Sequence, residues 1–244
     1  MIVRWLSAVA TDFSELQLVR DNGLASIVLN RPERKNALGK TLVSELSNAL
    51  DQISRDRSVR VVTISSRVPG VFCAGADLKE RAEMAQDEVS DFVSSLRSCF
   101  SQISDLPQPT IAAIEGAALG GGLELALACD FRVVGEKAKL GLPETSLAII
   151  PGAGGTQRLT RLVGLSRAKE LVFTARKFGA REALEYGIAD RLASDGLTAE
   201  AVAKKFAEEI LPNVSPVSKI SISFYLGSFG CTCGQTCNEC WRSM

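Results

Sequence analysis

The stretch from Thr110 to Val134 carries the pattern that decides the fold. It contains TIAAI at residues 110–114, GGGLELALAC at 120–129 and FRVV at 131–134. The first and last segments are short, largely apolar and rich in β-branched residues, which is typical of strands buried on both faces of a sheet. Between them, three glycines open an apolar helix. A strand, a helix and a second strand in this order predict an α/β fold with a parallel sheet.

The same alternation continues on both sides of this stretch. Apolar residues recur at helical spacing in several segments, and β-branched runs lie between those segments. We expect strands at 25–29 and 59–64 with a helix at about 38–55 between them, and further helices at about 80–104, 166–175, 180–186 and 198–210. The predicted fold class is therefore α/β, with a C-terminal part that is mostly helical.

Composition excludes several kinds of catalysis. The chain has 244 residues, 28 Lys and Arg against 28 Asp and Glu, and no histidine. Without an imidazole it cannot hold a Ser-His-Asp triad, a Cys-His pair or an H-E-x-x-H zinc site. An acid or base would have to be a carboxylate, Lys, Tyr, Cys or a backbone group. A metal site would need Cys or carboxylate ligands.

Charge and hydropathy also limit the partners of the chain. A formal net charge of zero argues against general attraction to nucleic acid or to an anionic membrane. No apolar run approaches the ~20 residues of a membrane span. The first ten residues, MIVRWLSAVA, are followed by Asp12 and make no convincing signal or transit peptide.

Four glycine-containing segments are candidate ligand sites. Residues 39–41 end like a phosphate loop, but Arg34 occupies the place of its first glycine, so that interpretation fails. Residues 151–156 could cradle an anion, and a structural turn is the favoured alternative. Residues 72–77 and 120–122 each follow a strand and offer unhindered backbone amides. If these amides converge they form an oxyanion hole, and the alternative is that the glycines serve tight packing.

Two glutamates stand in apolar surroundings. Glu124 lies in the first turn of the apolar helix, and Glu144 follows Gly141-Leu142-Pro143. Such carboxylates are either ordinary N-terminal helix charges or partly buried acids with a raised pKa. In a chain without histidine, the pair is the leading candidate for the general acid and base.

The last thirty residues differ from the rest. From Ser215 the helical and strand periodicity fails, and the segment contains four closely spaced cysteines, Cys231, Cys233, Cys237 and Cys240. Zinc ligation is one interpretation of these cysteines. Structural zinc sites usually separate their two ligand pairs in sequence so that a small fold wraps the metal, but here the two pairs are almost adjacent. We expect no metal site, and a zinc-binding interaction module is the alternative.

Taken together, these segments resemble the crotonase superfamily, and within it the enoyl-CoA hydratases. The resemblance covers roughly residues 23–212, in order and at family-like spacing. It is closest to the mitochondrial branch that contains 3-methylglutaconyl-CoA hydratase. The matching segments are LNRP at 29–32 with NAL at 36–38, FCAGADLKE at 72–80, ALGGGLELA at 118–126, LGLPE at 140–144 and PGAGGTQRL at 151–159.

The resemblance implies a crotonase (ClpP-like) fold, a spiral of β-β-α turns followed by helices that assemble homotrimers or hexamers. We accordingly divide the chain into an N-terminal extension (1–22), a spiral core (23–196), a partial helical region (197–214) and an atypical Cys-rich tail (215–244), for which we expect little order. Family members continue past a proline like Pro216 with further helices. This chain continues there into the Cys-rich tail instead, so a catalytically impaired variant is one alternative.

The resemblance also assigns the site. Glu124 and Glu144 fall on the two catalytic glutamates, of which we expect Glu124 to activate water and Glu144 to supply the proton. The amides of Ala74 and Gly121 fall on the oxyanion hole. The implied substrate-binding residues are Lys35, Ala37, Ala74, Gly75, Ala76, Asp77 and Leu78, with the loop from Lys35 to Ala37 seating the CoA nucleotide.

The implied activity is syn addition of water to a 2-trans-enoyl-CoA, giving a 3-hydroxyacyl-CoA in the mitochondrion. The acyl-CoA thioester is the expected partner, and no cofactor is expected beyond the CoA of the substrate. Alternatives are a 3-methylglutaconyl-CoA hydratase-type or enoyl-CoA isomerase activity. Some relatives bind RNA through a Lys-rich helix, but residues 40–57 contain one Lys and are interrupted by Glu45, Asp51 and Asp56, which argues against RNA.

Overall fold

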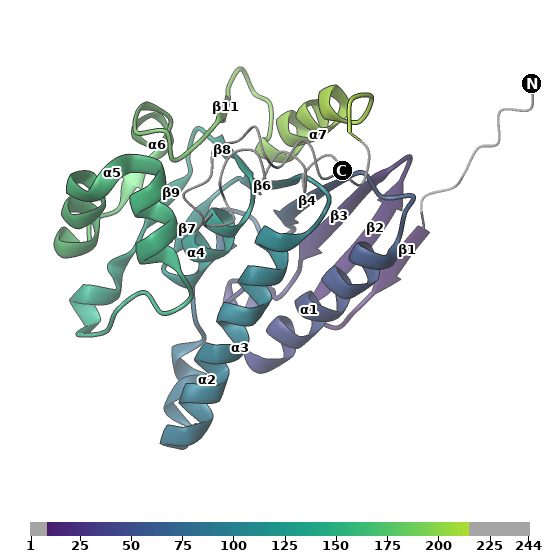
Figure 1. Cartoon of the computed structure of the whole chain (residues 1–244). Helices are drawn as coiled ribbons and strands as arrows, with labels where there is room; N and C mark the ends of the chain where they lie inside the picture. Colours follow the sequence, from purple (N-terminus) through teal and green to yellow (C-terminus); the bar gives the residue numbers. More distant parts are fainter. Residues whose placement is uncertain (1–8, 215–244) are drawn as a thin grey trace, which may run out of the picture.

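The structure is a computed structural model, and it describes residues 9–214 of the chain. Strands in two sheets form its framework (Figure 1). The strands are β1 (Val9–Asp12), β2 (Leu16–Asp21), β3 (Leu24–Leu29), β4 (Val61–Ser66), β5 (Val71–Cys73), β6 (Thr110–Ile114), β7 (Ala117–Leu119), β8 (Phe131–Gly135), β9 (Lys139–Gly141), β10 (Phe178–Gly179) and β11 (Arg191–Ala193).

Helices connect and cover the strands. The α-helices are α1 (Lys40–Arg55), α2 (Leu78–Ala82), α3 (Gln86–Asp105), α4 (Gly121–Ala128), α5 (Gly155–Thr174), α6 (Ala180–Glu185) and α7 (Ala199–Ile210). Two 3-10 helices, η1 (Pro32–Arg34) and η2 (Pro143–Leu147), begin at prolines, whose fixed φ suits the first turn of a helix.

The topology is a repeated β-β-α unit. The larger sheet has the order β1-β2-β3-β4-β6-β8-β11, and the smaller sheet has the order β10-β9-β7-β5. From β3 to β11 neighbouring strands of the larger sheet are parallel, and β5, β7 and β9 are parallel in the smaller one. Each of β4, β6 and β8 is followed by a short strand of the other sheet and then by helical structure. This is the expected spiral of β-β-α turns.

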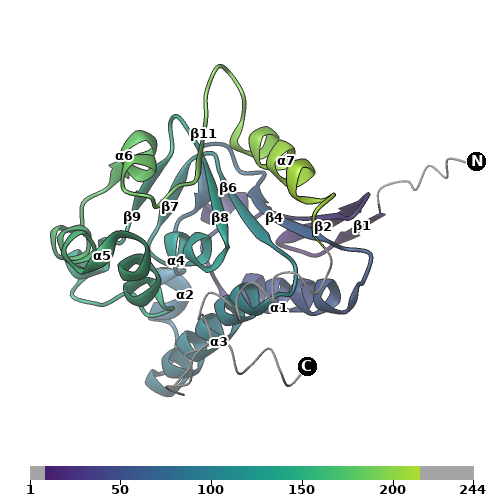
Figure 2. The ribbon, with the colours of Figure 1, turned by 45° about the horizontal axis from the view of Figure 1, so that its top comes forward.

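The central strands of the larger sheet are buried on both faces. Successive side chains of a strand point to opposite faces. In β6, Ala112 and Ile114 accordingly face the main core with α1 and α3, whereas Ile111 and Ala113 pack with Ala203 of α7. Figure 2 shows α7 on one face of the sheet and α1 and α3 on the other. The continuous apolar pattern of 110–114 follows from this double burial.

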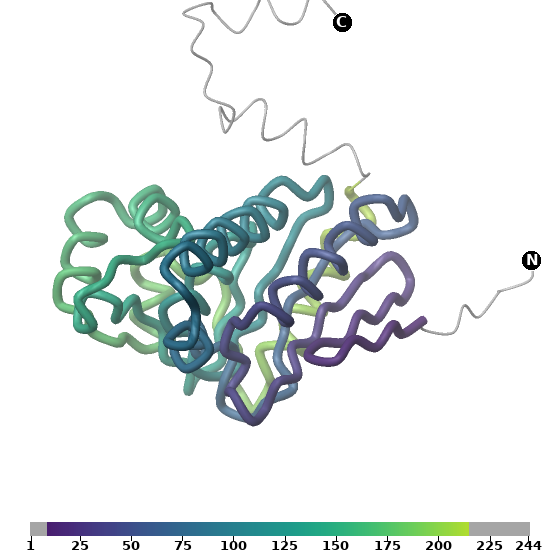
Figure 3. The backbone as a smooth tube through the Cα atoms, turned by 90° about the horizontal axis from the view of Figure 1, so that it is seen from below, coloured from purple at the N-terminus to yellow at the C-terminus, as the bar shows by residue number. Residues whose placement is uncertain are grey.

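Several elements differ from the expected ranges. The helix expected over 80–104 is two helices, α2 and α3. Helix α5 begins at Gly155 rather than at 166, and it is interrupted at Gly164, whose φ of 79° is not helical. Residues 9–21, within the segment we set apart as an N-terminal extension, form β1 and β2 of the larger sheet. Figure 3 shows this hairpin at one end of the molecule and α5 and α6 at the other.

A membrane-spanning helix is not found among residues 9–214, since no helix there combines the necessary length and apolar character.

Candidate active site

Two glycine-rich turns meet at one edge of the smaller sheet. Strands β5 and β7 pair in parallel, so the turns that follow them, 74–77 and 120–122, emerge side by side. At Gly122 a Cβ atom would lie 2.1 Å from the Cys73 carbonyl oxygen, and only glycine permits this close approach. The turns expected to offer backbone amides are therefore in contact.

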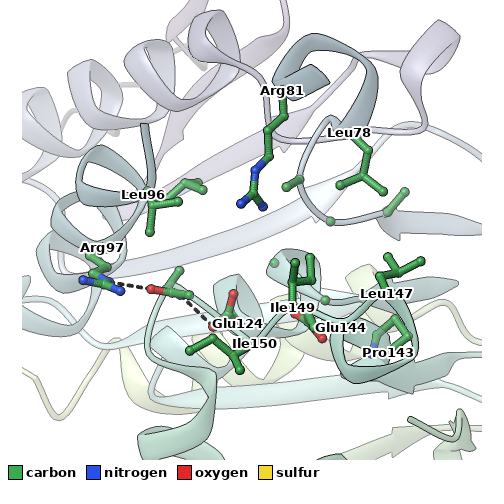
Figure 4. A pocket seen from close by; sticks show the side chains of 18 of the residues that line it. Leu78, Arg81, Leu96, Arg97, Glu124, Pro143, Glu144, Leu147, Ile149 and Ile150 are labelled. Carbon is green, nitrogen blue, oxygen red and sulfur yellow. Dashed lines mark hydrogen bonds between the residues drawn. The ribbon is translucent and has the colours of Figure 1, made fainter. Parts of the chain in front are cut away.

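These turns border a cavity of about 420 Å³, which we call the glutamate cavity. It brings together seven of the predicted site residues: Ala74, Gly75, Ala76, Leu78, Gly121, Glu124 and Glu144. Apolar side chains of α3 and of the segment after η2 line it as well, among them Val93, Leu96, Ile149 and Ile150 (Figure 4). The cavity thus combines two carboxylates, a glycine-rich wall and an apolar surface.

Glu124 is held by the backbone of a distant loop. Its side chain is 3% exposed, and its Oε1 accepts hydrogen bonds from the Ala153 amide at 2.9 Å and the Gly155 amide at 2.8 Å. Burial raises the pKa of Glu124, while the two amides and the Arg158 guanidinium act to lower it. Residues 151–156 therefore do cradle an anion, the carboxylate of Glu124, where the sequence favoured a structural turn.

Glu144 has different surroundings. It lies in η2, its side chain is buried, and its Oε2 accepts no hydrogen bond from any residue between 9 and 214. Burial, together with the nearby charge of Glu124, raises the pKa of Glu144 to about 7. Gly120 adopts φ 53° and ψ −124°, and a Cβ there would lie 3.1 Å from Glu144 Oε1. Glycine at 120 thus lets the carboxyl group rest against the turn.

The amide donors differ from the expected pair at one position. The Ala74 amide donates to the Lys35 carbonyl at 3.1 Å, so it is already used within the fold. The Leu38 amide donates to the Gly75 carbonyl, and the Asp77 amide donates to the Leu38 carbonyl. Leu38 and Ala76 thus form an isolated parallel bridge in which the Ala76 amide itself is not used.

The Ala76 amide lies beside Gly121 and can take the place that Ala74 was expected to fill. A Cβ added at Gly121 would lie 3.5 Å from the Ala76 nitrogen. Gly121 is the first residue of α4, where amides have no partner within the helix. Neither amide donates a hydrogen bond to another residue of the described range. Ala76 and Gly121, rather than Ala74 and Gly121, are therefore the pair of neighbouring amides without a partner in the described range, and an oxyanion hole formed by them stays a prediction.

Lys35, Ala37 and Asp77 do not line the glutamate cavity. Lys35 is exposed and Ala37 is buried. The Asp77 carboxylate caps α2 by accepting from the Lys79 and Glu80 amides, both at 3.2 Å. Burial alone would raise the pKa of Asp77, but the capping amides and the charge of Arg31 hold it below its usual value. The side chain of Asp77 therefore has a structural role.

Sequence reasoning missed two residues whose side chains connect the loop at 31–37 to the segment at 72–77. Arg31 donates to the Ala37 carbonyl at 2.8 Å and pairs with Asp77 at 3.0 Å. The buried Asn36 side chain donates to the Phe72 carbonyl at 2.9 Å. Both residues belong to segments that carry the resemblance to the family, 29–32 and 36–38, and this resemblance was the signal that could have identified them. Arg81 and Arg97, which also line the cavity, had no such signal.

The described residues provide no metal site. Between residues 9 and 214 no group of three or more Cys, Asp or Glu side chains could hold a metal ion. Cys73, Cys99 and Cys129 are buried. The four cysteines from Cys231 to Cys240, together with the rest of the expected tail, lie outside the described residues.

Comparison with known proteins agrees with this geometry. Residues 19–220 match the family described as enoyl-CoA hydratase/isomerase. The chain belongs to this family. Its fold is similar to the crystal structure of an enoyl-CoA hydratase from Bacillus anthracis, with a TM-score of 0.79 and 47% identity, covering 88% of this chain and 82% of that one. The crotonase fold predicted from the sequence is thereby confirmed.

Relatives within the family are similar over much of the chain. The probable mitochondrial enoyl-CoA hydratase 2 of Arabidopsis thaliana is 62% identical over 69% of this chain and 56% of its own length. The mitochondrial methylglutaconyl-CoA hydratase of Mus musculus is 50% identical over 83% of this chain and 67% of its own length. The chain thus spans between just over half and two thirds of the length of these curated relatives.

Proposed function

We propose that this chain catalyses the addition of water to the 2,3 double bond of a 2-trans-enoyl-CoA, giving a 3-hydroxyacyl-CoA. One observation carries the proposal: two buried glutamates with raised pKa values line the same cavity as two unused backbone amides. Membership of the enoyl-CoA hydratase/isomerase family supports a CoA thioester as the substrate.

The amides of Ala76 and Gly121 would hold the thioester oxygen. Attack at C3 of the enoyl group pushes electrons toward this oxygen, so negative charge develops on it in the transition state. Donors already in place stabilise this charge more than they stabilise the neutral thioester. This difference lowers the barrier to attack.

The two glutamates would divide the proton transfers. The Glu124 carboxylate, held in place by two amides, accepts a proton from water as the water attacks C3. Glu144, with a pKa of about 7, is protonated in a large fraction of molecules near neutral pH and gives its proton to C2. Both groups border one cavity, and the proposal is that they deliver water and proton to the same face of the double bond, as syn addition requires.

Isomerisation of the double bond is the second enzymatic candidate. Moving a proton between C4 and C2 needs only one acidic residue, so the presence of both Glu124 and Glu144 favours hydration. An RNA-binding role has less support, because Lys40, the one lysine of α1, is paired with Glu88 at 3.1 Å. An impaired variant is the remaining alternative, and activity measurements decide it.

Assembly, location and cofactor needs follow from the same proposal. Exposed apolar side chains on α5, Leu162, Leu165 and Phe173, are suited to a subunit contact, and we propose a homotrimer or hexamer. The relatives named as mitochondrial support a mitochondrial location. The proposed step uses carboxylates and amides of this chain and calls for no cofactor beyond the CoA of the substrate. Light scattering of the full chain tests the assembly.

Hydration of crotonyl-CoA tests the function. The full chain is expected to consume the enoyl thioester, and Glu124→Gln and Glu144→Gln are each expected to lower kcat by about 10²- to 10⁴-fold, as for loss of a general acid or base. Glu185→Gln, an exposed substitution on α6, is the matched control and should keep the wild-type rate. Full activity in both active-site variants, or no hydration by the wild type, would contradict the proposal.

A further inference from the structure

One peptide group of the loop before α5 lies between a cation and the carboxylate of Glu124. The Gly152 carbonyl accepts a hydrogen bond from Arg97 Nε at 2.5 Å. The Ala153 amide, which belongs to the same peptide group, donates to Glu124 Oε1 at 2.9 Å. Arg97 of α3 is therefore linked to the Glu124 carboxylate by two hydrogen bonds in series (Figure 4).

The loop depends on such contacts for its conformation. Residues 149–154 belong to no helix or strand, so the directions of their amides are set by neighbouring elements. Helix α3 makes two contacts at Gly152: the hydrogen bond from Arg97, and Val93, whose Cγ1 would lie 3.3 Å from a Cβ added at this glycine. Because Ala153 follows directly, holding Gly152 against α3 aims the Ala153 amide at the carboxylate.

A cation on the carbonyl side of a peptide group strengthens the hydrogen bond on its amide side. Electron density drawn toward the carbonyl oxygen leaves the N–H more positive, and hydrogen bonds in series polarise one another in this way. The bond from Arg97 is itself charge-assisted, a class roughly twice as strong as bonds between neutral groups. The arrangement therefore favours the ionised form of Glu124, which is the form that accepts a proton from water.

Arg158 of α5 provides a comparison within the same loop. It donates to the Ala153 carbonyl at 2.9 Å. That carbonyl shares its peptide group with the amide of Gly154, which is not one of the two amides bonded to Glu124 in the described part of the chain. Arg158 thus brings a similar charge to the loop without the connection through a peptide group that Arg97 has.

The charged groups around Glu124 come from several elements. Burial raises the pKa of Glu124, and the two cradle amides and the charges of Arg158 and Arg97 act to lower it. Glu144 of η2 lines the same cavity, and Arg81 of α2 extends into it across from both glutamates (Figure 4). Among these four neighbours, Arg97 is the one that bonds the peptide group donating to Glu124.

We propose that Arg97 is a positioning residue for Glu124: through the peptide group between α3 and the carboxylate, it fixes one cradle amide and keeps Glu124 ionised. The role of Glu124 as the base rests on the proposed function, whereas the link from Arg97 to its carboxylate can be measured without turnover. Because Arg97 acts through the loop, its removal should lower kcat and leave KM unchanged.

Infrared titration measures the link without catalysis. Glu144→Gln serves as the background, because Glu124 is then the carboxyl group that remains in the described lining of the cavity. Adding Arg97→Met should raise the midpoint at which Glu124 loses its proton, and by more than adding Arg158→Met does. Arg97→Lys, which keeps a charged donor, should restore most of the original midpoint. Arg55→Met removes an exposed arginine of α1 and is the control.

Kinetics of the single variants give the functional readout. In Arg97→Met we expect kcat for crotonyl-CoA to fall about tenfold at neutral pH, as for loss of one charge-assisted hydrogen bond. The decline of kcat on the acid side should begin at a higher pH, and Arg97→Lys should keep most of the wild-type rate. Circular dichroism checks that the variants are folded, as expected for changes at an exposed side chain.

The outcomes separate this role from others. A folded Arg97→Met variant with an unchanged Glu124 midpoint would overturn the proposal whatever its kcat, because a purely structural role does not move the midpoint. A shift no larger than that of Arg158→Met would also overturn it, since charge at a distance then suffices. A higher KM at constant kcat would place Arg97 on the substrate instead. If the midpoint shifts as expected but the wild type hydrates no enoyl-CoA, the link stands and the proposed function fails.

Discussion

Glu124 and Glu144 are identical residues on the wall of one cavity, yet the chain surrounds them in opposite ways. Glu124 receives two backbone hydrogen bonds on one oxygen, whereas Glu144 keeps a buried oxygen without a partner among residues 9–214. Hydrogen bonds to a carboxylate favour its charged form, and burial without them favours the neutral form. In the proposed mechanism, backbone placement rather than residue type therefore makes Glu124 the base and Glu144 the acid.

Displacing Glu144 should have the largest effect. Gly120→Ala introduces a Cβ 3.1 Å from Glu144 Oε1 at a residue with φ 53°, and it distorts the turn that presents the Gly121 amide. We expect kcat for crotonyl-CoA to fall by about 10³-fold, since acid and oxyanion donor are both disturbed. Steady-state kinetics measure this loss, and circular dichroism checks that the variant is folded. A folded variant with near wild-type kcat would contradict the account.

Displacing Glu124 should cost less, because the backbone there needs no special φ. In Gly155→Ala the new Cβ would lie 2.9 Å from Glu124 Oε1 and 2.8 Å from its Cγ. The carboxylate must then leave its two amides, and we expect kcat to fall about 10- to 100-fold. Gly179→Ala is the control, because the nearest atom to its Cβ is Lys139 Nζ at 3.9 Å. Equal rates for the two variants would show that the amide cradle is unimportant.

The pH profile should reflect the asymmetry. Glu144 must carry a proton to donate it, and its pKa of about 7 means that this form is lost as the pH rises through neutrality. We therefore expect kcat for hydration to decrease above about pH 7, approaching tenfold per pH unit. Ionisation of Glu124, whose pKa is also raised, sets the decline on the acid side. Rates measured from pH 5 to 9 that stay constant above pH 7 would assign the acid elsewhere.

The smallest effect is expected from Arg158, which supports the cradle from outside. Its guanidinium donates to the Ala153 carbonyl at 2.9 Å, and its charge acts to lower the pKa of Glu124. Arg158→Met should lower kcat a few-fold and shift the acid side of the pH profile to higher pH. Arg161→Met, on the exposed face of the same helix, is the control. An unshifted profile would show that Arg158 has no influence on Glu124.

Local patterns predicted the parts of the fold that depend on local burial. The segments 110–114 and 131–134 are strands because both faces of the sheet are covered, and this leaves a continuous apolar run in the sequence. Strands β5, β7 and β9 have only three residues each, too few for a periodic signal. The early turns of α5 were missed because Gly164 interrupts the pattern.

The site was predictable where function depends on residue type and less so where it depends on backbone direction. The sequence and its resemblance predicted Glu124, Glu144 and Gly121 as site residues, and the structure brings all three to one cavity. The choice between the amides of Ala74 and Ala76 depends on the pairing of this turn with Lys35 and Leu38, which are distant in sequence. The direction of Arg81 likewise depends on how α2 is set against the cavity.

Infrared titration of the carboxyl groups tests the central claim most directly. The account predicts a protonated-carboxyl band in the wild type that disappears with a midpoint near pH 7, is absent from Glu144→Gln and has a lower midpoint in Glu124→Gln, because the Glu124 charge raises the pKa of Glu144. A band near pH 7 that survives in Glu144→Gln and vanishes in Glu124→Gln would reverse the two roles and contradict the account.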